Sequence, residues 1–402
     1  MVEFLLVMDT TMANSAYDPS GGLINATTMS PLTTESTDLL NASSLWNNSS
    51  GPAGTATEAL YLDEETPLKR FSQWYQGIHG YVSIMVCIFG VISNVMNIVV
   101  LTQKNMITST NLILTALAIA DMLTMASYLP YALYFYCIAI PDWRYNHPHG
   151  WIVYLLFNTN FIITVHTFAM WLTVALAVFR YIVVCHHTLG PKLCNLQRAK
   201  LTIVAVFVAT CIFCIPNYVM YTPVKLESSG GYWFKQNEFV SEFHKVFNYW
   251  LFGVVLKVAP CVLLTVLSSL LIRAMRHADM KRRRLKSQGK RAESERTSEH
   301  NRTTAMLVAV VLCFVVAELP QGILAFLSGV DTNIFLNVYV PLGDIWDIIV
   351  LVNSAVNFLL YCIMSRQFRQ TFKDVFFTCK PKMNKATNGV AYSSINTQST
   401  KL

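Results

Sequence analysis

The sequence predicts an all-α membrane protein, a seven-transmembrane helix bundle followed by a short interfacial amphipathic helix. Of the 402 residues, 53% are hydrophobic and 13% are charged, whereas a soluble domain carries about 25% charged residues. Seven apolar segments are each long enough to cross about 30 Å of hydrocarbon at about 1.5 Å per helical residue. The composition therefore excludes a soluble enzyme, a disordered chain and a fibrous repeat.

The charges follow a membrane topology and not a nucleic-acid footprint, although the net charge is +7. Residues 1–77 contain nine acids and two bases, whereas residues 273–302 contain eleven Lys or Arg and four acids. Residues 364–402 contain seven Lys or Arg and one acid. The positive-inside rule predicts an extracellular amino terminus, a cytoplasmic carboxyl terminus and an odd number of spans.

The first 77 residues are rich in Ser, Thr and Asn and show no apolar periodicity. We therefore expect a disordered extracellular tail. Four Asn-x-Ser/Thr sequons predict that this tail is glycosylated at one or more of the following positions: Asn25, Asn41, Asn47 and Asn48.

The transmembrane bundle is expected over residues 78–363. Its seven apolar segments are 78–102, 110–136, 151–184, 199–221, 246–272, 303–328 and 337–363. Prolines inside them, such as Pro260 and Pro320, predict helix kinks, which neighbouring helices tolerate in a bundle.

Residues 364–402 are expected to form an interfacial helix and a cytoplasmic tail. From Arg366 to Phe377, apolar and basic side chains separate onto two faces, a pattern typical of a helix lying on the inner leaflet. Cys379 follows this helix and is either palmitoylated or a free thiol.

Several polar residues lie inside the apolar spans, where each needs a partner. They are Asn94 in the first span, Asp121 in the second, and Asn353, Ser354 and Asn357 in the seventh. We expect one cluster that either holds water or a sodium ion at Asp121 or packs as a hydrogen-bonded core without an ion. No other metal-ligand spacing, nucleophile motif or phosphate loop is present in the sequence, so we expect no cofactor and no enzymatic activity.

Three motifs carry a family resemblance. Leu-Ala-Ile-Ala-Asp ends at Asp121, Ala-Val-Phe-Arg-Tyr at Tyr181, and Asn-x-x-x-Asn-x-x-x-Tyr at Tyr361. In this order they resemble the rhodopsin-like G-protein-coupled receptors over residues 78–377. The resemblance implies a heterotrimeric G protein as partner, with arrestin and membrane lipids as further candidates. It also implies activation and coupling roles for Asp121, Arg180, Tyr181, Asn357 and Tyr361.

The sequence departs from the usual pattern of these receptors in ways that narrow the family. Phe179 replaces the acid before Arg180, and Glu318 replaces the tryptophan two residues before Pro320. With Glu-Leu-Pro-Gln-Gly beginning at Glu318, the chain resembles the invertebrate myosuppressin (FMRFamide-related peptide) receptors, and the related sex peptide and myoinhibitory peptide receptors. The resemblance implies a neuropeptide ligand, plasma-membrane localisation and an extracellular amino terminus.

The outer loop between the fourth and fifth spans departs from the family in another way. Receptors of this kind usually tie that loop to the third span with a disulfide, but residues 146–165 and 222–245 contain no cysteine. We expect packing of Tyr232, Trp233 and Phe234 to hold the loop instead.

Candidate ligand-binding residues lie in the outer parts of the spans. Lys257 and Glu318 form either a structural ion pair or a site where Glu318 binds an arginine of the peptide. Asp344 and Asp347 either receive the guanidinium of an Arg-Phe-amide ligand or form a solvated helix end. Three further residues are either pocket lining or core: His166, Tyr128 and Tyr131.

The sequence therefore predicts a receptor for an amidated neuropeptide of the FMRFamide or myosuppressin type. A myoinhibitory or sex-peptide-like ligand is the first alternative. A membrane transporter using Lys257, Glu318 and Asp121 as an ion path is the second, although no inverted repeat supports it.

Overall fold

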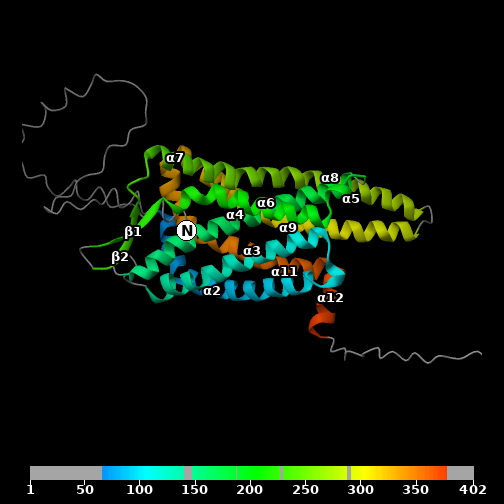
Figure 1. Cartoon of the computed structure of the whole chain (residues 1–402), viewed down its shortest axis with the longest axis horizontal. Helices are drawn as coiled ribbons and strands as arrows, with labels where there is room; N and C mark the ends of the chain where they lie inside the picture. Colours follow the sequence, from blue (N-terminus) through cyan, green and yellow to red (C-terminus); the bar gives the residue numbers. More distant parts are fainter. Residues whose placement is uncertain (1–65, 140–146, 187, 227–229, 288–290, 378–402) are drawn as a thin grey trace, which may run out of the picture.

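The structure is a computed structural model that describes residues 66–139, 147–186, 188–226, 230–287 and 291–377. Seven helices in this part of the chain are long and apolar enough to cross a membrane, which confirms the predicted bundle. They run side by side, with a β-hairpin at one end and the amphipathic helix at the other (Figure 1). The four tail sequons and Cys379 lie outside the described residues.

The first five elements build three spans. They are α2 (Pro67–Leu101), η2 (Lys104–Met106), α3 (Ser109–Ala132), the π-helical η3 (Leu133–Ile138) and α4 (His149–Cys185). Two helices follow, the short α5 (Gly190–Leu193) and the fourth span α6 (Leu196–Tyr218).

The later spans are assembled from several elements each. The fifth combines α7 (Glu242–Trp250), the π-helical η4 (Leu251–Val258) and α8 (Ala259–Ser287). The sixth is α9 (Arg291–Val330). The seventh follows α10 (Thr332–Ile334) and comprises η5 (Phe335–Tyr339), η6 (Val340–Leu342) and α11 (Gly343–Met364).

Helix α2 begins earlier than the sequence analysis expected. It starts at Pro67 instead of residue 78, so the end of the predicted disordered tail is helical. The side chain of Thr66 accepts a hydrogen bond from the backbone nitrogen of Lys69 at 3.3 Å, and proline suits the first helical position because it lacks an N–H. The sequence analysis missed this start because the first turns of α2 have low hydropathy, although they carry a capping residue and aromatic side chains.

The bundle core is formed by side chains that point between the helices. Helix α4 packs against α3, α6, α8 and α9, so it lies centrally. Fully buried residues from four helices, among them Leu117, Met170, Phe314 and Tyr361, form the core of the inner half. Many apolar side chains of α6 point outward instead, as a lipid-facing surface requires.

The outer loop folds back on the bundle as a hairpin. Strand β1 (Tyr221–Lys225) pairs antiparallel with β2 (Tyr232–Gln236), and Gly230 supplies the positive φ of 72° before β2. Trp233 is 1% exposed and Phe234 is buried beside it, while the backbone nitrogen of Tyr232 donates to the carbonyl of His147 at 2.9 Å. The prediction that aromatic packing anchors this loop is confirmed.

The predicted interfacial helix is present as α12 (Arg366–Phe376). Phe368 is buried and its ring lies 5.5 Å from that of Tyr361, so the apolar face of α12 docks on the end of α11. Asn105 donates to the hydroxyl of Thr371 at 2.8 Å, which joins α12 to η2.

Candidate ligand-binding and signalling sites

Two carboxylates at the outer end of α11 are held by tyrosines of the second span. The hydroxyl of Tyr136 donates to Oδ1 of Asp344 at 2.6 Å, and the hydroxyl of Tyr128 donates to Oδ2 of Asp347 at 3.2 Å. Both acids are half-buried, so neither lies on a fully solvated helix end. Hydrogen bonds of this kind fix the carboxylates without neutralising them.

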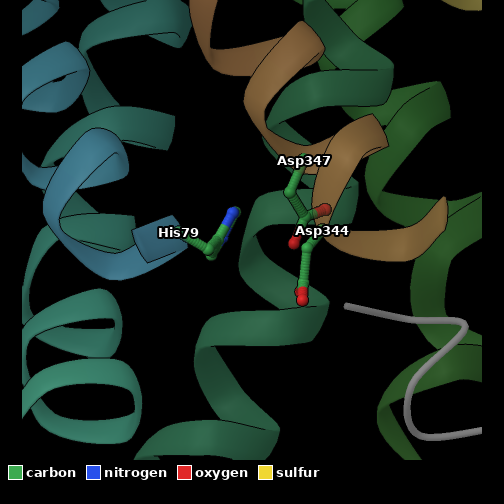
Figure 2. Close-up of side chains that lie close together, drawn as sticks. All are labelled: His79, Asp344 and Asp347. Atoms are coloured by element: carbon green, nitrogen blue, oxygen red, sulfur yellow. The ribbon is translucent and has the colours of Figure 1, made fainter. Parts of the chain in front are cut away.

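His79 of α2 belongs to the same cluster and was missed by the sequence analysis. Its side chain is 0% exposed, and Nε2 lies 2.8 Å from the Tyr128 hydroxyl. Figure 2 shows its imidazole turned toward Asp344 and Asp347. A histidine inside an apolar span was the available signal, but only the packing of α2 on α11 reveals its partners.

Tyr131 forms part of the wall of this cluster. Its ring lies 5.3 Å from the ring of Tyr128 and 5.8 Å from that of Tyr136, in edge-to-face arrangements. It is buried, so it supports the two tyrosines that bind the acids.

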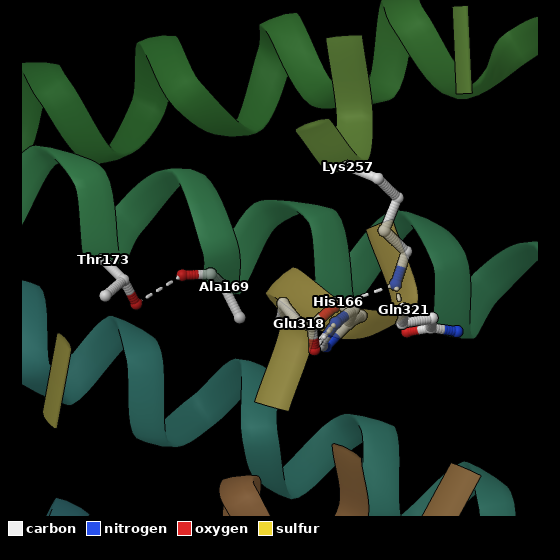
Figure 3. Close-up of polar contacts among 6 residues, drawn as sticks. All are labelled: His166, Ala169, Thr173, Lys257, Glu318 and Gln321. Carbon is white, nitrogen blue, oxygen red and sulfur yellow. Dashed lines mark hydrogen bonds and ion pairs between the residues drawn. The ribbon is translucent and has the colours of Figure 1, made fainter. Parts of the chain in front are cut away.

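A second cluster of charged and polar side chains lies inside the bundle, between the third, fifth and sixth spans. Each of its charges would be costly in the bilayer without a partner. Nζ of Lys257 in η4 lies 2.9 Å from Oε2 of Glu318 in α9, and it also donates to Oε1 of Gln321 at 3.0 Å. Nε2 of His166 in α4 lies 2.9 Å from Oε1 of Glu318 (Figure 3). Both oxygens of Glu318 therefore have partners, and the carboxylate is 1% exposed.

This geometry favours the first of the two alternatives for Glu318 and Lys257, and a ligand-binding role for Glu318 stays a prediction. They form the structural ion pair, and His166 completes it from a third helix. A ligand arginine would have to displace a buried lysine to reach Glu318, which removes a paired charge at high cost. Asp344 and Asp347 are consequently the better placed acids for a cationic ligand.

The polar residues inside the first, second and seventh spans meet as expected. Nδ2 of Asn357 donates to Oδ2 of Asp121 at 2.9 Å, and Nδ2 of Asn94 donates to the carbonyl of Ser354 at 3.1 Å. Nδ2 of Asn353 is buried without a partner among the described residues. These contacts make a hydrogen-bonded core, and a sodium ion at Asp121 stays a prediction.

Two residues with expected coupling roles, Arg180 and Tyr361, lie near the carboxyl ends of α4 and α11. Arg180 is 9% exposed, and its Nε has no hydrogen-bond partner in the described part of the chain. Tyr181 is half-buried, with its ring 5.9 Å from that of His186. Phe179 precedes Arg180 in the sequence, so no carboxylate of the adjacent residue restrains the guanidinium.

The family of the chain follows from comparison with known proteins. The model of the serpentine type 7TM GPCR chemoreceptor Srw family matches residues 81–379. The chain belongs to this family. It is therefore a multi-pass G-protein-coupled receptor and not an enzyme, as predicted.

Three known receptors are similar to this chain in sequence. The G-protein coupled receptor dmsr-1 of Caenorhabditis elegans is 30% identical over 365 residues, covering 76% of this chain and 69% of the relative. The sex peptide receptor of Drosophila melanogaster is 31% identical, covering 79% of this chain and 76% of the relative. The FMRFamide receptor of Drosophila melanogaster is 24% identical, covering 74% and 53% respectively.

Proposed function

We propose that this receptor binds an amidated neuropeptide of the FMRFamide or myosuppressin type outside the plasma membrane and activates a heterotrimeric G protein inside. The amino-terminal tail lies outside and carries glycans. The observation that supports this most is the pair of tyrosine-held carboxylates, Asp344 and Asp347, at the outer end of α11. The resemblance to an FMRFamide receptor supports the ligand class.

The peptide's arginine provides the chemistry of recognition. A guanidinium that leaves water needs a carboxylate, and a pair of acids three residues apart offers up to two. Asp347 is the principal partner, because Tyr128 orients one of its oxygens, and Asp344 is the second. The aromatic wall of Tyr128, Tyr131 and Tyr136 suits the phenylalanine that follows arginine in such peptides.

Helix α11 links the ligand site to the inner face. Asp344 and Asp347 lie in its first turns, Asn357 binds Asp121 at mid-helix, and Tyr361 packs on α12 at its end. A peptide that contacts the two acids differently in two bundle arrangements shifts the population between them. The G protein then engages the inner end around Arg180, and arrestin competes for the same face.

A sex-peptide-like or myoinhibitory ligand is the second candidate. It is favoured by the identity to the sex peptide receptor, 31% against 24% for the FMRFamide receptor. Family membership gives no comparable support to a transporter.

A panel of peptides tests the proposal. Cells expressing the receptor are exposed to Arg-Phe-amide, myosuppressin and Trp-amide peptides, and ligand-stimulated nucleotide exchange is measured. An Arg-Phe-amide peptide should act, and Asp347→Asn should weaken it by about 2–5 kcal/mol if the pair is buried. An analogue with citrulline for arginine should be weaker on the wild type and little affected by the substitution.

The matched control is Asp331→Asn. Asp331 is an exposed acid just after α9 whose carboxylate accepts a hydrogen bond from the nearby backbone nitrogen of Asn333. This substitution should leave the potency of both peptides unchanged. Equal weakening of the arginine and citrulline peptides by Asp347→Asn would show that Asp347 is structural, and activation by Trp-amide peptides alone would favour the second candidate.

A further inference from the structure

His79, Asp344 and Asp347 form a compact group of metal-ligand side chains. One ring nitrogen of His79 and one oxygen of each carboxylate lie within 4.8 Å of one another. Helix α2 supplies the histidine and α11 supplies both acids, and the three side chains converge between these helices (Figure 2). In tetrahedral zinc sites, ligand atoms are about 3.3 Å apart, so small side-chain rotations suffice to close this group around an ion.

One ring nitrogen of His79 has no hydrogen-bond partner in the described part of the chain. Nε2 of His79 lies 2.8 Å from the Tyr128 hydroxyl, which donates to Asp347, and 3.2 Å from the Ser83 hydroxyl. In the tautomer in which Nε2 donates to the Tyr128 oxygen, the neutral imidazole carries its lone pair on Nδ1. This Nδ1 is buried and has no hydrogen-bond partner within the described residues. A buried ring nitrogen without a partner costs free energy, and in this tautomer a cation bound beside the two carboxylates would recover it.

We propose that His79, Asp344 and Asp347 bind a zinc ion at the outer end of the bundle. An imidazole with two carboxylates favours zinc over calcium or magnesium, which prefer all-oxygen sites. Three protein ligands leave a fourth position for water. Tyr128 and Tyr136 already hold one oxygen of each acid, and such hydrogen bonds orient metal ligands and strengthen their binding.

The zinc ion has a consequence for signalling that rests on the proposed function. Zinc and the guanidinium of a peptide's arginine need the same carboxylate oxygens of Asp344 and Asp347. Both cations cannot occupy these oxygens together without strong repulsion. Zinc therefore acts as an antagonist of an arginine-containing peptide and affects its citrulline analogue less.

The direct test is a titration of the full-length purified receptor with zinc chloride, followed by calorimetry, in the absence of peptide. The wild type should bind zinc, and magnesium chloride should produce no binding. His79→Gln should weaken zinc binding at least about tenfold, because loss of a mere hydrogen-bond partner of a ligand already costs about 10–100-fold. His149→Gln is the matched control, since His149 is an exposed histidine at the same end of the bundle.

Asp344→Asn is the second variant and should weaken zinc binding likewise, which keeps the test valid if His79→Gln does not reach the folded state. Zinc binding that survives in either folded variant, or is absent in the wild type, overturns the site. In cells, zinc should lower the potency of the arginine peptide on the wild type.

The two proposals fail in different ways. Absence of zinc binding together with an intact arginine-to-citrulline difference overturns the zinc site alone. Zinc binding that His79→Gln removes, with no effect of zinc on peptide potency, supports the site and overturns the shared use of the carboxylates by the peptide.

Discussion

The buried network around Glu318 gives a quantitative prediction for Lys257→Met. Lys257 and Glu318 are 7% and 1% exposed, and their Nζ and Oε2 atoms are 2.9 Å apart. Removing the lysine leaves the carboxylate buried, with His166 as its one hydrogen-bond partner from another helix among the described residues. Breaking a buried pair typically costs 3–5 kcal/mol.

We expect a value near the lower end of that range, about 3 kcal/mol, because His166 keeps its hydrogen bond to Oε1 of Glu318. At about 2 °C per kcal/mol for a chain of this size, thermal unfolding of the purified receptor should shift down by roughly 6 °C. The double variant Lys257→Met with Glu318→Gln removes both charges and should recover most of this loss, since no uncompensated charge then stays buried.

The control is the exposed pair of Lys235 and Glu238. Its Nζ and Oε1 atoms are 2.7 Å apart, but the side chains are 47% and 81% exposed. Lys235→Met should therefore leave the unfolding temperature unchanged, because solvent screens the pair. If Lys257→Met and the double variant unfold at the same temperature, the stranded charge is not the cause and the reasoning fails.

Four further predictions concern other parts of the receptor. Mild reduction should leave peptide affinity unchanged, because packing and not a disulfide holds the outer hairpin. Trp233→Ala should weaken peptide affinity for the same reason, and radioligand binding measures both effects. Phe179→Asp should lower basal nucleotide exchange at equal surface expression by restraining Arg180, and unchanged basal exchange would count against this. Gly80→Ala should lower the unfolding temperature, since its Cβ would lie 2.6 Å from the Cβ of Tyr136. Endoglycosidase treatment of intact cells should increase gel mobility if the tail sequons are outside and glycosylated.

The sequence by itself determined the number of spans and the amphipathic helix. Hydropathy and segment length are local properties, so they can be read from the sequence without knowing which helices pack together. The sequence also predicted the ion pair of Lys257 and Glu318 as one of two alternatives, because a charge in hydrocarbon requires a partner and the spans contain few candidates.

The tertiary structure alone decided which polar groups meet between helices. His79 and Tyr128 are 49 positions apart, and Tyr128 and Asp347 are 219 apart, yet they share one cluster. His166 reaches Glu318 across 152 positions. Helix rotation and relative height set such contacts, and both depend on the packing of the whole bundle, which local patterns of charge and hydropathy do not specify.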